Sequence, residues 1–77
     1  MKFNVGDKVK IREDLIVWKR YGGLTLYDGS MAAQRGKIGF VMLSDRNYYR
    51  VSNAEDFFWS EEMLELVKNK NEFNKLE

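Results

Sequence analysis

The sequence predicts an all-β domain, a small five-stranded barrel with a long first loop and a short helical turn before the last strand. Short segments rich in β-branched and aromatic residues recur about every ten residues, which is the spacing of a barrel. Turn-forming pairs such as Gly-Asp, Gly-Gly and Asp-Gly separate these segments. The chain has 77 residues, 44% of them hydrophobic, which is enough for one thin core but not for two.

Residues 7–12 are the first predicted strand. Val9 and Ile11 fall on one side of it, and the basic residues Lys8, Lys10 and Arg12 fall on the other. This alternation is the period of a strand with one buried face and one solvated face.

Residues 13–35 are predicted to form the long loop, because they lose this alternation and contain the turn signal Gly22-Gly23. Connections longer than about 12 to 15 residues usually have a function or contain short elements of their own. We therefore predict a helical turn over residues 31–34, with Ser30 as its N-cap and Gly36 at its C-terminal end.

Residues 37–43 are the second predicted strand, and they are apolar on both faces. The side chains on one face are Gly39, Val41 and Leu43, and those on the other are Ile38, Phe40 and Met42. A small barrel buries only one of these sets. We expect the second set to be covered by the long loop, by a partner, or by another copy of the chain in a weak homodimer.

Two further short strands are predicted at residues 48–51 and 56–59, after polar turns at 44–47 and 52–55. Their aromatic and β-branched residues favour extended structure. The strands are close enough in sequence to pair as successive hairpins.

The C-terminal part begins with Ser60, a predicted helix cap followed by Glu61 and Glu62, whose charges suit a helix N-terminus. Beyond it, residues 64–67 could form a closing strand, or residues 61–76 could form one helix. We expect the strand. The domain is then residues 1–67, followed by a polar, disordered tail at 68–77 whose final Leu-Glu is typical of a cloning remnant.

The predicted core is formed by inward-facing apolar residues of all five strands and of the N-terminal segment. These residues are Phe3, Val9, Ile11, Val41, Val51, Phe57, Trp59 and Leu64.

Composition argues against catalysis. The chain has no histidine and no cysteine, which removes serine-histidine and cysteine-histidine catalysis, thiol redox chemistry and nearly all zinc, copper or haem sites. Its paired carboxylates, Glu55-Asp56 and Glu61-Glu62, are adjacent in sequence and diverge in extended chain. We expect no enzyme, no catalytic residue, no metal site and no cofactor.

Neither the net charge nor the hydropathy of the chain predicts strong binding to a polyanion or to a membrane. The formal net charge is +1, although residues 1–50 carry ten basic and five acidic side chains and residues 51–67 carry five acidic and no basic ones. No apolar run approaches the roughly 18 residues of a membrane span, and the N-terminus lacks a signal-peptide core. We expect a cytoplasmic protein without membrane contact.

Several short motifs resemble a known protein type. They are Gly6-Asp7-Lys8-Val9, Tyr21-Gly22, Met31, Gly36-Lys37, Tyr49-Arg50-Val51 and Trp59-Ser60-Glu61-Glu62-Met63-Leu64. As a set, covering residues 3–67, they resemble the small SH3-like proteins of phages and prophages in Gram-positive bacteria. Those proteins are mostly uncharacterised, so the resemblance implies an SH3-like barrel and a phage-related setting rather than an activity.

A looser resemblance involves about a dozen residues. Gly6-Asp7-Lys8-Val9, followed later by residues 36–41, is similar to KOW-type barrels, which bind RNA or protein. A purely structural cause is also open, because a small barrel needs a glycine at a tight turn and another where a strand crosses close to its neighbour.

Aromatic residues suggest where a partner would bind. The chain has 11 of them (two Trp, four Tyr and five Phe) and four Met, more than so small an interior needs. We predict a non-catalytic protein-interaction module that binds a protein partner through exposed apolar residues on one side. The predicted residues are Trp18, Tyr21, Tyr27, Phe40, Met42, Tyr48 and Phe58.

The alternative function is binding of RNA or single-stranded DNA, with phosphates held by basic residues and bases stacked on the rings between them. The basic residues concerned are Lys8, Lys10, Arg12, Lys19, Arg20, Arg35 and Lys37. A solvated strand face whose charges pair with nearby acidic residues is the simpler reading of the same pattern.

Overall fold

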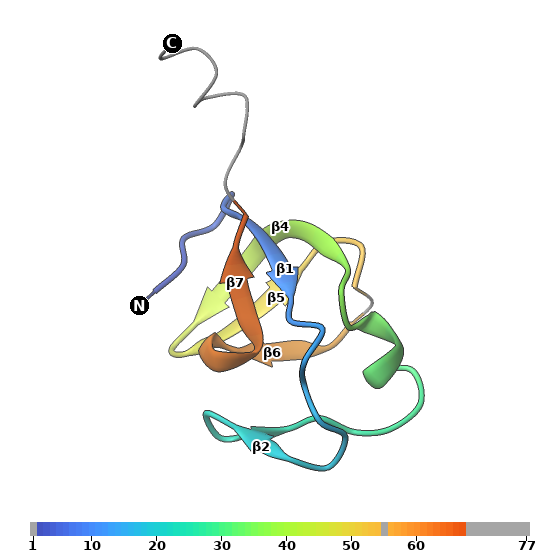
Figure 1. The fold of residues 1–77 in the computed structure, drawn as a ribbon. Helices are drawn as coiled ribbons and strands as arrows, with labels where there is room; N and C mark the ends of the chain where they lie inside the picture. The colour runs from blue at the N-terminus through green and yellow to red at the C-terminus, as the bar shows by residue number, and fades with distance from the viewer. Residues whose placement is uncertain (1, 55, 68–77) are drawn as a thin grey trace, which may run out of the picture.

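The computed structural model describes residues 2–54 and 56–67, which form strands and two single-turn 3-10 helices (Figure 1). The strands are β1 (Lys8–Ile11), β2 (Arg20–Tyr21), β3 (Leu24–Thr25), β4 (Ile38–Asp45), β5 (Tyr48–Val51), β6 (Phe58–Ser60) and β7 (Leu64–Leu66), and the 3-10 helices are η1 (Ala32–Gln34) and η2 (Glu61–Met63). No α-helix occurs in this part of the chain, so the fold is all-β.

Five strands form one antiparallel sheet in the order β6-β5-β4-β1-β7, and β2 and β3 form a separate two-stranded hairpin. The strands β4, β5 and β6 are neighbours in sequence and in space, whereas β1 lies between β4 and β7. Figure 1 shows the sheet curling around a common interior, with the hairpin at the lower end of the molecule and the first part of β4 at the upper end. The turn η2 joins the two outer strands, β6 and β7.

Each of the five predicted strands is present in this sheet, with ends that differ from the predicted ones by up to two residues. The alternative helix over residues 61–76 is wrong where it can be compared, because Glu61–Met63 is one 3-10 turn and Leu64–Leu66 is a strand paired with β1. The predicted tail, residues 68–77, lies outside the described residues.

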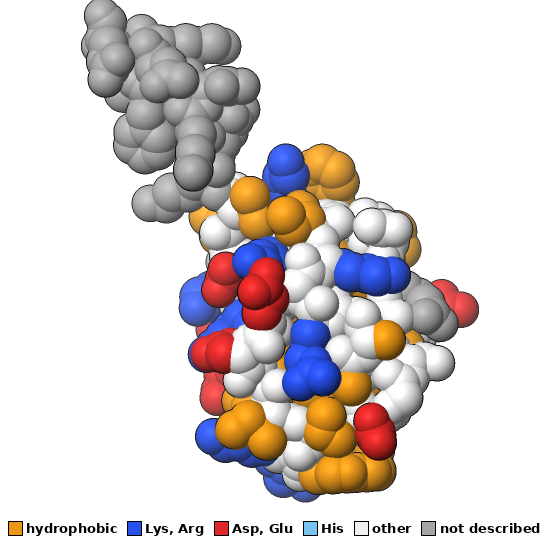
Figure 2. Space-filling view, turned by 45° about the vertical axis from the view of Figure 1, so that its right-hand side comes forward, with side chains coloured by type: hydrophobic (Ala, Val, Ile, Leu, Met, Phe, Trp, Pro, Cys, Tyr) orange, Lys and Arg blue, Asp and Glu red, His pale blue; other side chains and the backbone are white. Residues whose placement is uncertain are grey.

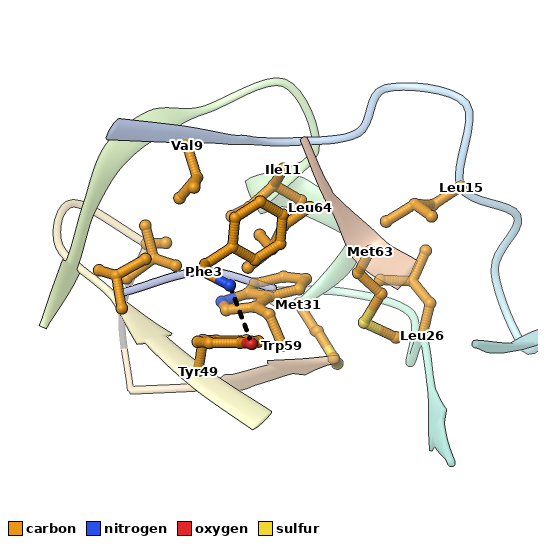
Figure 3. Packing of buried hydrophobic residues seen from close by; sticks show 13 residues of the cluster. Phe3, Val9, Ile11, Leu15, Leu26, Met31, Tyr49, Trp59, Met63 and Leu64 are labelled. Carbon is orange, nitrogen blue, oxygen red and sulfur yellow. Dashed lines mark hydrogen bonds between the residues drawn. The ribbon is translucent and has the colours of Figure 1, made fainter. Parts of the chain in front are cut away.

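The core contains seven of the eight predicted residues, all buried (Figure 3). Phe57, the eighth, lies just before β6 and is half-buried. Its ring packs edge-on against the Trp59 ring, with the two centroids 6.1 Å apart. Phe3 packs edge-on against Tyr49 at 5.4 Å, and its backbone N–H donates to the Tyr49 hydroxyl at 3.3 Å. The N-terminal segment is thereby fixed across the interior of the sheet.

The long loop also supplies core residues, namely Leu15, Leu26 and Met31. Its hairpin was not predicted. Gly22 and Gly23 have φ values of +56° and +95°, and a two-residue turn with both φ values positive matches the twist of paired strands. The predicted helical turn at residues 31–34 is the 3-10 helix η1, but its N-cap is Met31 and not Ser30, and no side chain bonds at this cap.

A β-bulge in β4 changes which side chains face outward. The register shifts between Val41, which pairs with Val51, and Leu43, which pairs with Arg50. Leu43 was predicted to share a face with Gly39 and Val41; it is instead exposed, because the extra residue reverses the alternation.

The close approach of β4 to the end of β5 explains Gly39. A Cβ atom at this position would overlap the backbone carbonyl oxygen of Ser52. The same two segments are joined by hydrogen bonds from the Phe40 N–H to Ser52 Oγ at 2.8 Å and from the Ser52 N–H to the Phe40 carbonyl at 2.9 Å. The structural reason expected for this glycine is therefore confirmed.

Candidate functional site

The β2–β3 hairpin carries the most exposed pair of aromatic side chains in the described residues. Trp18 and Tyr27 are 63% and 56% exposed and meet edge to face, with ring centroids 5.5 Å apart and planes at 88°. Ile16, beside them in the loop, is also exposed. We call Trp18 and Tyr27 the hairpin pair.

The backbone around the hairpin pair is held by a short ladder. The Trp18 N–H donates to the Leu26 carbonyl at 2.6 Å, and the Leu26 N–H donates to the Lys19 carbonyl at 3.1 Å. Leu26 itself is fully buried, so this ladder connects the pair to the core. Buried Leu26 thus alternates with exposed Tyr27, which places the tyrosine ring outside.

Trp18 has a left-handed backbone, with φ of +71°. A bulky residue is rare in this region, where glycine and asparagine are favoured. The Lys19 N–H donates to the Ile16 carbonyl at 3.1 Å across the same turn. The turn therefore uses a strained residue whose ring remains mostly in solvent.

Arg35 fixes the base of this loop. Its guanidinium donates to the Leu15 carbonyl at 2.8 Å and to the Ala32 carbonyl at 2.9 Å. Arg35 was predicted to contact nucleic acid. In the folded chain, its guanidinium joins two segments of the loop through these hydrogen bonds.

Tyr21 and Tyr48, two other members of the predicted partner site, are half-buried. Tyr21 packs against the core, and its hydroxyl accepts a hydrogen bond from the Ile16 N–H at 2.9 Å. A Cβ atom on Gly23 would come within 2.6 Å of the Tyr48 hydroxyl, so Tyr48 lies directly against the hairpin turn. Tyr21 thus connects the hairpin to the core, and Tyr48 lies against the hairpin turn.

The remaining predicted partner residues lie elsewhere, on the outer face of the sheet. Phe40 and Met42 on β4 and Phe58 on β6 are exposed there, and Ile38 and Leu43 are exposed beside them. We call Ile38, Phe40, Met42, Leu43 and Phe58 the outer face. Sequence alternation identified Ile38, Phe40 and Met42 but missed Leu43, because the bulge is not visible in the pattern.

The structure thus divides the predicted site between two surfaces. Figure 1 places the hairpin below the first part of β4, although the end of β4 approaches the hairpin turn through Tyr48, which pairs with Asp45. Figure 2 shows hydrophobic side chains gathered at the lower end, where the hairpin lies, and a second group at the upper end, with charged side chains of both signs between them. A partner that binds the hairpin pair does not need to touch the outer face.

The basic row of β1 is largely paired with acidic neighbours. Lys10 Nζ lies 2.9 Å from Glu13, and Arg12 holds Asp14 with two hydrogen bonds of 3.0 and 2.7 Å. The pKa of Asp14 lies below its ordinary value, mainly because Asp14 accepts hydrogen bonds from Arg12. The pKa of Lys10 is raised, mainly because Lys10 donates a hydrogen bond to Glu13. Two of the three basic residues of β1 are therefore matched by carboxylates within the chain.

Two other basic residues of the predicted nucleic-acid set also make contacts in the fold. Lys19 Nζ lies 5.5 Å from the centre of the Tyr21 ring, and Arg20 donates to the Gly23 carbonyl at 3.3 Å. Lys8 and Lys37 are exposed at the border of the outer face, where Lys8 pairs in register with Phe40. The seven basic residues do not form one continuous surface.

A cleft of about 510 Å³ lies beside β1 and is lined by charges of both signs, including Lys2, Arg12, Asp14 and Glu65. Within residues 2–54 and 56–67, no group of three or more Asp, Glu, His or Cys side chains could hold a metal ion. The same residues include no helix with the length and apolarity to cross a membrane.

Comparison with family models, with curated proteins and with solved structures finds no match for this chain.

Proposed function

We propose that this chain is a non-catalytic protein-interaction module of the phage-related SH3-like type, and that the hairpin pair is its binding site. The strand order β6-β5-β4-β1-β7, the curl of the sheet and the turn η2 before the last strand support an SH3-like barrel. The long loop between β1 and β4 then presents the site from a rigid base, as binding loops commonly do.

The observation that carries the proposal is the conformation of Trp18. A left-handed backbone costs a non-glycine residue about 1–2 kcal/mol, and glycine or asparagine would avoid most of this cost. The exposed indole recovers little of it through burial. Strain combined with exposure at one residue favours a role in binding, because strained residues that do not serve the core cluster at functional sites.

A protein partner suits the site better than a nucleic acid. Trp and Tyr supply large, stiff contact areas and are enriched among the residues that dominate protein interfaces. Lys10 and Arg12, the cations that a phosphate backbone would use first, already have carboxylate partners within 3 Å. The alternative of RNA or single-stranded DNA binding is therefore an outcome of the test below.

The experiment compares the wild type with the double variant Trp18→Asn, Tyr27→Ala in affinity capture. Asparagine tolerates the left-handed backbone, so the fold should survive while both rings are removed. Val5→Ser, which removes an exposed apolar side chain outside the hairpin pair and the outer face, is the matched control. We expect the double variant to lose a specific prey that the control retains, and to bind that prey, once purified, at least tenfold more weakly in calorimetry.

Equal binding by the double variant and the wild type would overturn the proposal. A titration with labelled single-stranded DNA and RNA at low and moderate salt tests the alternative. Tight binding that weakens steeply with salt, and that Lys10→Glu reduces, would support the nucleic-acid function in place of the protein one.

A further inference from the structure

We propose that the outer face is the interface of a homodimer, with a second copy of this chain as its occupant. This inference does not rest on the hairpin pair, because Trp18 and Tyr27 flank the β2–β3 hairpin, whereas four of the five outer-face residues lie on β4. It rests on the apolar area of the outer face, on the charges around it and on the symmetry of its central strand.

The apolar area matches what a second copy could cover. The exposed fractions are 44% for Ile38, 52% for Phe40, 56% for Met42, 47% for Leu43 and 39% for Phe58. With roughly 150–200 Å² for a fully exposed side chain of this size, these residues leave roughly 400 Å² of apolar surface on each copy. Two copies bury roughly 800 Å² of it, and at about 65% apolar area this corresponds to an interface of about 1,200 Å². That value is at the lower limit of stable interfaces and predicts a weak dimer.

The charges around the outer face favour a neutral occupant. Lys10, which pairs in register with Ile38, is bound to Glu13, and Arg50, which lies between Leu43 and Phe58, is bound to Asp56 at 2.6 Å. The Arg50 guanidinium also lies over the Phe58 ring, 5.3 Å from its centre. A polyanion would have to displace these two carboxylates to reach Lys10 and Arg50, whereas another copy covers the apolar side chains and meets only the repulsion between the two Lys8 side chains.

The central strand is self-complementary. On β4, Phe40 has an apolar neighbour two residues away on either side, Ile38 and Met42, and all three are exposed. A two-fold axis at Phe40 that runs the two β4 strands in opposite directions places Phe40 on Phe40, and Ile38 on Met42. The same axis brings the two Lys8 side chains near one another, because Lys8 pairs in register with Phe40. Salt screens this repulsion, so the dimer should strengthen as salt is raised.

Sedimentation equilibrium of the full chain, from micromolar to millimolar concentration, tests the proposal. We expect a reversible dimer of the wild type, and at least tenfold weaker association of Phe40→Glu and of Met42→Glu. Trp18→Glu is the matched control, because it adds the same charge at an exposed apolar residue of the hairpin, and it should dimerise as the wild type does. Amide spectra of each variant verify the fold.

A second measurement does not depend on any variant. Amide chemical shifts of the labelled wild type should change with concentration at residues 38–43 and 58, and not at residues 16–27. A wild type that remains monomeric at millimolar concentration would overturn the proposal, as would a dimer that persists in both glutamate variants or shift changes confined to the hairpin. Association that weakens with salt would overturn the two-fold arrangement, because the two Lys8 side chains repel one another in it.

Discussion

The variant Gly39→Ala tests whether the fold requires Gly39, which is one of the glycines in the KOW-like sequence pattern. The added Cβ would overlap the Ser52 carbonyl oxygen, and this oxygen is backbone, which moves only with β5. Relief of the overlap requires separation of the two segments and loss of the two hydrogen bonds between Phe40 and Ser52.

The expected cost is large for a domain of this size. Each lost hydrogen bond contributes about 1 kcal/mol, and forced shifts in a packed interior cost about 1–3 kcal/mol. The free energy of unfolding should therefore fall by about 3–5 kcal/mol. A chain of this length is stable by about 4–12 kcal/mol in total, so the loss is about a quarter or more of its stability.

Urea unfolding followed by circular dichroism measures this loss, and Gly29→Ala is the control. Gly29 has φ of +77° and open space around its Cβ position, so alanine there meets only the backbone cost of about 1–2 kcal/mol. Gly39→Ala should unfold at a clearly lower urea concentration than Gly29→Ala. Equal midpoints for the two variants, or a Gly39→Ala protein as stable as the wild type, would refute the steric explanation.

Variants at three further residues test contacts that hold the loop and the N-terminal segment. Arg35→Met should lower the free energy of unfolding by about 1–2 kcal/mol in thermal denaturation, because two loop carbonyls lose a charged donor, and Arg35→Lys should restore only part of it. Tyr49→Phe should cost about 1 kcal/mol by the same assay, because the buried Phe3 N–H loses its acceptor; an unchanged midpoint would show that water replaces the hydroxyl. Arg12→Gln should raise the pKa of Asp14 towards its ordinary 3.8 in a carboxyl NMR titration. Because the pKa of Asp14 is depressed in the folded state, the Arg12–Asp14 pair stabilises the fold above about pH 4. This contribution disappears as the pH falls through the folded pKa of Asp14. The free energies of unfolding of the variant and the wild type should therefore converge in acid.

Local composition, turn signals and, in β1, alternation were sufficient to predict the five sheet strands. In β1, Val9 and Ile11 face the core, and the polar residues between them face outward, as the period of two requires. Tyr48–Val51 was predicted to the residue, because its alternation is bounded by polar turns on both sides. These elements are determined by side chains close in sequence.

The elements that were missed depend on distant contacts or on unusual backbone. The β2–β3 hairpin could have been found from Gly22-Gly23 between residues that favour strands, which is a known signal of a two-residue turn. The bulge that turns Leu43 outward leaves no such signal, because it follows from how β4 must bend to pair with both β1 and β5. The division of the aromatic residues between two surfaces likewise depends on the strand order, which composition does not contain.

That division determines how the two proposed interactions combine. A dimer formed through the outer face leaves the hairpin pair of each copy accessible, because Trp18 and Tyr27 flank the β2–β3 hairpin, whereas the outer face is formed by β4 and β6. Such a dimer carries two copies of the Trp18–Tyr27 site related by a two-fold axis. A partner with repeated binding segments would then be held by both sites, and the second contact would benefit from a high effective concentration. A weak dimer and a small binding site are therefore compatible with firm attachment to a repetitive assembly, and Phe40→Glu should reduce binding to a two-segment ligand while leaving binding to a single segment unchanged.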